Sequence, residues 1–151
     1  MIVAQELTES SPHDAGALPD LLGQVEGRVH RLVADAAYDK RSVYDAGKAK
    51  GAVVVVPPSR SSVRAKERCS PHPARDRVIA HVRRVGLRQW KVDRGWHQQA
   101  RAENGVFRYK QIIGPSMRAR DPAGQRVEAR LACSILNRMT VMGRPESHAV
   151  R

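Results

Sequence analysis

The sequence predicts an α/β fold, because segments with strand character alternate with segments of helical periodicity over the first 56 residues. The strongest strand signal is the run Ala52–Val56, in which four valines follow one another and Pro57 and Pro58 end the run. A continuous β-branched run of this kind is typical of a strand buried on both faces. With 151 residues the chain has room for one domain.

The first half of the chain supplies the other elements of this sheet. Ile2–Thr8 alternates apolar and polar residues and is expected to be a strand. Because this strand starts at the first residue, we expect a part of the fold to lie upstream of it. Ala15–Val25 is amphipathic and predicts a helix that starts close to Pro19. Val29–Ala34 is predicted to be a second strand, ending at Asp35.

A turn and a short helix connect the second predicted strand to the run at Ala52. Residues 35–39 form the strand-to-helix turn, and Ser42–Lys50 is predicted to be a helix that Gly51 ends. A helix between two strands predicts a parallel pair with a right-handed crossover.

The second half is more basic and more helical. Residues 59–76 hold several arginines among serines and prolines, without apolar periodicity, and predict a mobile basic loop. Three helices and an extended tail are expected after it, at residues 77–87, 95–114, 127–139 and 143–147.

Composition points to a polyanionic partner. The formal net charge is +12 and the sequence pI is near 10.8, so nucleic acid is the first candidate and an anionic membrane surface the second. No run of about 18 apolar residues exists to span a bilayer. The N-terminus lacks the pattern of a secretory signal, which predicts a cytoplasmic protein with Cys69 and Cys133 as reduced, unpaired thiols.

Two carboxylates stand out in this basic chain. Asp35 follows a strand at the position where α/β proteins place reactive groups, although a helix cap or a local turn would explain it equally well. Asp39 is the more natural cap for the next helix. Glu103 is the only acidic residue in 95–114, and a chance position on a surface helix also explains it. Together Asp35 and Glu103 would suit a magnesium site acting on a phosphodiester.

Several motifs, in order, resemble bacterial insertion-sequence transposases of the DDE type, in particular those of insertion sequence family five. The matching segments cover nearly the whole chain and lie at residues 34–39, 51–58, 103–110, 112–114, 118–120, 129–139 and 143–147.

This resemblance implies a ribonuclease H-like mixed sheet flanked by helices, with two aspartates and one glutamate that bind two Mg²⁺ ions. Asp35 corresponds to the second aspartate and Glu103 to the glutamate. Lys110 matches the family's lysine seven residues after the glutamate. Trp96 stands where the family has a tyrosine, and Gln99 where it has an arginine.

The resemblance places the first aspartate on a strand upstream of Ile2–Thr8. We therefore expect residues 1–151 to be the C-terminal part of one N-terminally truncated catalytic domain that is inactive alone. A second copy of the chain, or a transposase portion encoded in an upstream frame, would be its protein partner. The implied substrate is double-stranded DNA at the terminal inverted repeats of a transposon.

DNA contacts are expected from basic side chains and from residues near Glu103. Trp90 and Trp96 could stack on bases, although packing in a core poor in aromatic residues explains both equally well. The residues expected to contact DNA are Arg60, Arg64, Arg83, Arg84, Lys91, Trp96, Gln99, Arg108 and Lys110. The alternative functions are a non-catalytic basic DNA-binding protein and, less favoured, a basic structural protein of ribonucleoprotein type.

Overall fold

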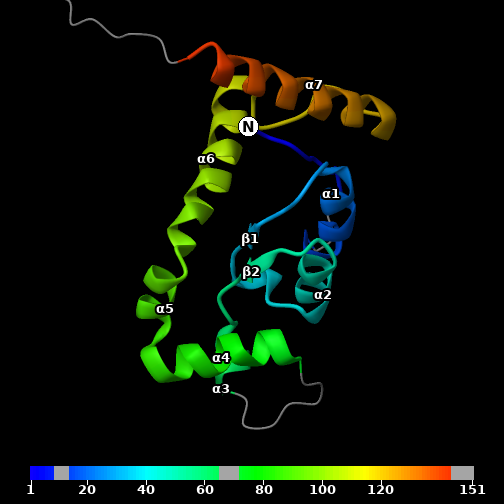
Figure 1. The fold of residues 1–151 in the computed structure, drawn as a ribbon. Helices are drawn as coiled ribbons and strands as arrows, with labels where there is room; N and C mark the ends of the chain where they lie inside the picture. Colours follow the sequence, from blue (N-terminus) through cyan, green and yellow to red (C-terminus); the bar gives the residue numbers. More distant parts are fainter. Residues whose placement is uncertain (9–13, 65–71, 144–151) are drawn as a thin grey trace, which may run out of the picture. The chain divides into compact units, whose positions relative to one another are not determined.

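The computed structural model describes residues 1–8, 14–64 and 72–143 (Figure 1). Its elements combine a two-stranded parallel sheet with a larger number of helices, which confirms the predicted α/β class. Contacts divide the chain into two compact units, residues 8–102 and residues 1–7 together with 103–151. None of the described helices is long and apolar enough to cross a membrane.

The sheet belongs to the unit of residues 8–102. Its strands are β1 (Arg31–Val33) and β2 (Val53–Val55), and helix α2 (Arg41–Ala49) connects them. They pair in parallel with Arg31 opposite Val53. The strand, helix and strand predicted from the sequence are therefore confirmed, with shorter strands than expected.

Helices cover both faces of this sheet, because Val55 at the end of β2 and Val56 directly after it enter different clusters. Val56 packs in a cluster that includes Val43 of α2 and residues of α1 (Leu18–Gln24). Val55 packs with Val82 of α4 (Pro73–Val85) and Trp90 of α5 (Leu87–Asp93). Side chains of a strand alternate between faces, so burial on both faces is confirmed for this end of β2. The predicted burial on both faces is wrong for Val53, which is 55% exposed.

Helix α2 lies unusually close to β2 at one point. A Cβ atom placed on Gly47 would overlap Cγ2 of Val54. Glycine at this position therefore lets the helix approach the strand. Gly51, with a φ of 68°, follows the end of α2, as the sequence predicted.

The expected basic loop at 59–76 is helical at both ends. Helix α3 spans Arg60–Arg64, and α4 begins at Pro73. His72 caps α4 by accepting a hydrogen bond from Arg75 N at 3.3 Å, with Pro73 in the first turn, where its missing N–H costs nothing. These local capping signals outweigh the lack of apolar periodicity. Cys69 lies outside the described residues.

The strand predicted at Ile2–Thr8 is wrong for the described residues 1–8, which have no strand structure. The side-chain amide of Asn137 instead holds the main chain of Ile2, with Ile2 N to Oδ1 at 2.6 Å and Nδ2 to Ile2 O at 2.7 Å. Alternation favours a strand only where a neighbouring strand supplies a ladder, and the described sheet contains only β1 and β2.

Asn137 lies on α7 (Pro122–Val141), which is longer than the helix predicted at 127–139. The side chain of Asp121 caps α7 by accepting from Gly124 N at 2.7 Å. The tail expected at 143–147 lies, apart from Gly143, outside the described residues.

The long helix predicted at 95–114 is divided into three parts. A 3-10 helix, η3 (Trp96–Gln99), precedes α6 (Ala100–Arg108), and a π-helix, η4 (Tyr109–Ile113), follows it. No residue of α6 is buried, and Val106 is 56% exposed. The apolar side chains of Val106, Tyr109 and Ile113 are therefore at most half-buried.

Candidate active site

Asp35 lies where the sequence predicted it, just beyond the carboxyl end of β1. The parallel ladder extends to the residue before it, because Ala34 N donates to Val55 O at 3.3 Å. The Asp35 side chain is exposed, and its Oδ1 accepts a hydrogen bond from Ala37 N at 2.8 Å. Asp35 thus caps η2 (Ala36–Tyr38). Oδ2 of Asp35 has no hydrogen-bond partner in the described part of the chain.

The cap expected at Asp39 is wrong. Lys40 precedes α2 without a side-chain cap, and the Asp39 carboxylate is instead buried, with 1% of its side chain exposed. Arg75 of α4 binds both of its oxygens, Nε to Oδ1 at 2.7 Å and Nη2 to Oδ2 at 2.9 Å. A planar guanidinium matches a carboxylate in this two-point geometry, which local sequence could not reveal across 36 residues.

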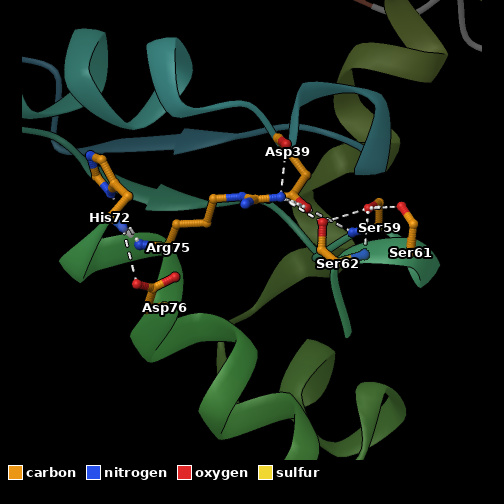
Figure 2. Close-up of polar contacts among 7 residues, drawn as sticks. All are labelled: Asp39, Ser59, Ser61, Ser62, His72, Arg75 and Asp76. Atoms are coloured by element: carbon orange, nitrogen blue, oxygen red, sulfur yellow. Dashed lines mark hydrogen bonds and ion pairs between the residues drawn. The ribbon is translucent and has the colours of Figure 1, made fainter. Parts of the chain in front are cut away.

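Serines complete the network around this ion pair (Figure 2). Ser59 N donates to Asp39 Oδ2 at 2.9 Å, and Arg75 Nη2 also reaches Ser62 Oγ at 2.5 Å. The hydrogen bond to Asp39 raises the pKa of Arg75 above its ordinary value. Arg75 thus connects α4 to the turn that carries Asp35.

Trp96 contacts the same strand end from η3. Its indole Nε1 donates to Ala34 O, directly before Asp35, at 3.0 Å. Lys91 Nζ lies 3.8 Å from the centre of the Trp96 ring, a cation–π geometry. The ring is half-buried and packs on the cluster of Val55 and Trp90. Trp90 is 1% exposed, so the core role weighed for it is confirmed.

The remaining DNA-contact residues of this unit differ in exposure. Arg60, Arg83 and Arg84 are exposed, and Gln99 is half-buried. Oε1 of Gln99 is buried without a hydrogen-bond partner within residues 1–8, 14–64 and 72–143. Arg64 belongs to α3, and its side chain is outside the described part.

Glu103 and Lys110 belong to the other unit. Glu103 lies in the first turn of α6 and Lys110 in η4, and both are exposed. Arg108 donates from Nη1 to Thr140 Oγ1 at 2.9 Å, and this hydrogen bond connects α6 to α7. It engages one nitrogen of a side chain that was predicted to contact DNA.

A further carboxylate in this second unit, Glu128, was not among the predicted residues. Glu128 on α7 accepts from Arg118 N at 2.9 Å and from Ala119 N at 2.8 Å. These two backbone donors lower the pKa of Glu128. Glu128 therefore holds the loop before α7.

A metal ion would require oxygen ligands. The exposed carboxylates of Asp35 and Glu103 are the ligand type that Mg²⁺ prefers, and Oδ2 of Asp35 is available for it. Among the described residues, no group of three or more His, Cys, Asp or Glu side chains is arranged to hold a metal ion.

The family model described as transposase DDE domain matches residues 1–138. The chain belongs to this family. Members of this transposase family act on DNA and generally use divalent metal ions. No solved structure matches the chain. The family resemblance inferred from the motifs is thus confirmed at the level of a DDE transposase domain.

Proposed function

We propose that the chain is the C-terminal part of an insertion sequence family five-like transposase with a ribonuclease H-like fold, and that Asp35 and Glu103 are its metal-binding carboxylates. The main support is the position of Asp35 at the carboxyl end of β1, in a chain that matches the transposase family over residues 1–138. Its DNA substrate would be the terminal inverted repeats of the transposon.

The residues around Asp35 would hold it for this role. The hydrogen bond from Ala37 N fixes one oxygen and leaves Oδ2 for an Mg²⁺ ion. The Asp39–Arg75 pair and the bond from Trp96 to Ala34 O restrain the turn on either side. Bound divalent cations would neutralise negative charge that develops on the scissile phosphate. Lys110, Arg83 and Arg84 would hold the DNA backbone.

We infer that these 151 residues bind DNA but do not cut it alone, because the resemblance assigns only two of its three carboxylates to this sequence. Incubating the purified chain with terminal-repeat DNA and Mg²⁺ should give binding without cleavage. Metal-dependent cleavage that is lost in Asp35→Asn would contradict the proposed inactivity.

The metal-binding role has a separate test that needs no cleavage. Mn²⁺ binding and its effect on DNA affinity should be reduced in Asp35→Asn and Glu103→Gln. Asp20→Asn and Glu26→Gln are matched controls, since both residues are exposed carboxylates outside the matching motifs. If all four variants bind Mn²⁺ like the wild type, the non-catalytic DNA-binding protein becomes the better description.

A further inference from the structure

A cavity of about 450 Å³ lies in the unit of residues 8–102, on the opposite end of the sheet from Asp35. Gly51, Ala52 and Val53 line it, and they form the start of β2. Asp35 follows the end of β1, and the two strands are parallel. The cavity is therefore distinct from the candidate active site, and its volume is typical of pockets for small organic ligands.

Among the described residues, the charged side chains that line the cavity are all basic. Lys48 from α2, Arg77 from α4 and Arg94 after α5 all line it, and no acidic residue does so among the described residues. Part of the Arg77 guanidinium donates to Pro73 O at 3.1 Å, which holds that side chain along α4. Three cationic side chains in the wall of one cavity favour an anionic group, and arginine and lysine are the usual ligands of phosphate.

Two buried donors in the cavity wall have no acceptor. The Tyr44 hydroxyl and the Trp90 indole N–H are buried, and neither finds a hydrogen-bond partner in the described chain. Tyr44 is 2% and Trp90 1% exposed, and both line the cavity. Burial raises the pKa of Tyr44, so its hydroxyl keeps the proton that it would donate. Unpaired buried donors are rare and costly, and a ligand with acceptor atoms would satisfy them.

The wall also contains apolar surface from Val54, Val78 and the Trp90 ring. A free phosphate would use the cations but neither this surface nor the volume. A nucleotide supplies a phosphate, a flat ring and acceptor atoms on that ring.

We propose that this cavity binds a single nucleotide, with its phosphate at Lys48, Arg77 and Arg94 and its base against the wall that contains Trp90 and Tyr44. This site does not depend on the assignment of Asp35 and Glu103. Either a free nucleotide or a nucleotide within a single DNA strand supplies this chemistry.

Isothermal titration of the full chain with thymidine 5′-monophosphate tests the proposal. We expect saturable one-site binding, with inorganic phosphate and thymidine each about tenfold weaker or more. Arg77→Gln and Lys48→Gln should each weaken binding by about tenfold. Arg88→Gln is the matched control, because Arg88 is an exposed arginine of α5 that does not line the cavity, and it should change binding less than about twofold.

A second pair of variants tests the cavity without changing charge. Ala74 lines the cavity and Ala80 does not, although both are exposed on α4. Ala74→Leu should obstruct the ligand and reduce affinity, whereas Ala80→Leu should leave it unchanged. Displacement of the nucleotide by a short single-stranded oligonucleotide would assign the site to DNA, and failure to displace it would assign the site to a free nucleotide.

Three results would overturn the proposal. These are the absence of saturable nucleotide binding, an equal loss in Arg88→Gln and Arg77→Gln, and phosphate binding as tight as nucleotide binding. Because none involves Asp35 or Glu103, failure here is distinguishable from failure of the proposed transposase site.

Discussion

The turn that carries Asp35 and the helix that carries Glu103 are held in different ways. The turn follows a paired strand, and it is restrained by the buried Asp39–Arg75 ion pair and by the bond from Trp96 to Ala34 O. Helix α6 has no buried residue, and Phe107 on it is 62% exposed. The two carboxylates proposed as metal ligands thus differ in local support, and substitutions should affect their regions unequally.

The largest loss of stability is expected from Asp39→Ala, in the turn that carries Asp35. It leaves Arg75 without its carboxylate partner in a half-buried position, and breaking such a pair costs about 3–5 kcal/mol of unfolding free energy. Asp35→Ala removes only an exposed cap and should cost about 1 kcal/mol. Urea denaturation measures both, and equal losses would show that Asp39 does not restrain the turn.

Core truncation should distinguish the same two regions. Ile79 on α4 is fully buried, and Ile79→Ala should cost about 3 kcal/mol through lost burial and the cavity left behind. Val106→Ala on α6 should change stability by less than about 0.5 kcal/mol, because Val106 is 56% exposed. A comparable loss in thermal unfolding of Val106→Ala would mean that α6 has a buried face after all.

A smaller effect on stability is expected from Trp96→Phe. The substitution keeps an aromatic ring but removes the N–H that binds Ala34 O, and one such hydrogen bond contributes about 1 kcal/mol. Amide hydrogen exchange of Ala36 and Ala37 should also become faster. Unchanged exchange at these two residues would show that Trp96 does not stabilise the turn.

The smallest effect on stability is expected from a substitution of Glu128, which lies outside both regions. Its folded-state pKa is lowered by the backbone donors of Ala119 and Arg118, so its contribution to stability is present above its ordinary pKa of 4.5 and is lost as the pH falls below that value. Glu128→Gln should therefore reduce the fall in stability between pH 5 and pH 3, as measured by denaturation at several pH values. A pH profile identical to that of the wild type would contradict this role.

Local sequence patterns predicted the β1–α2–β2 unit well, because a valine run ended by prolines and a helix ended by Gly51 act over a few residues. They failed where the outcome depends on a distant partner. Alternation at Ile2–Thr8 predicts a strand, but Asn137 supplies the hydrogen bonds there. The single partial domain expected for residues 1–151 stays a prediction.

In the candidate site, too, local features were predictable from the sequence and distant contacts were not. The position of Asp35 after a strand was predictable, and a cap was one of the explanations weighed for it. The burial of Asp39 was not predictable, because only the folded chain brings Arg75 to Asp39. The identity of Trp96 predicted an aromatic surface, but not that its N–H would bind the carbonyl before Asp35.

The close approach of α2 to β2 at Gly47 has a consequence for how this gene can vary. Any side chain at position 47 would collide with Val54 and displace the helix between the two strands, whereas a Cβ at Gly23 meets nothing within 4 Å. In a library of random variants selected for folding, codon 47 should therefore retain glycine while codon 23 drifts freely. Mutational tolerance at these two glycines would reflect the packing distance between a helix and a sheet.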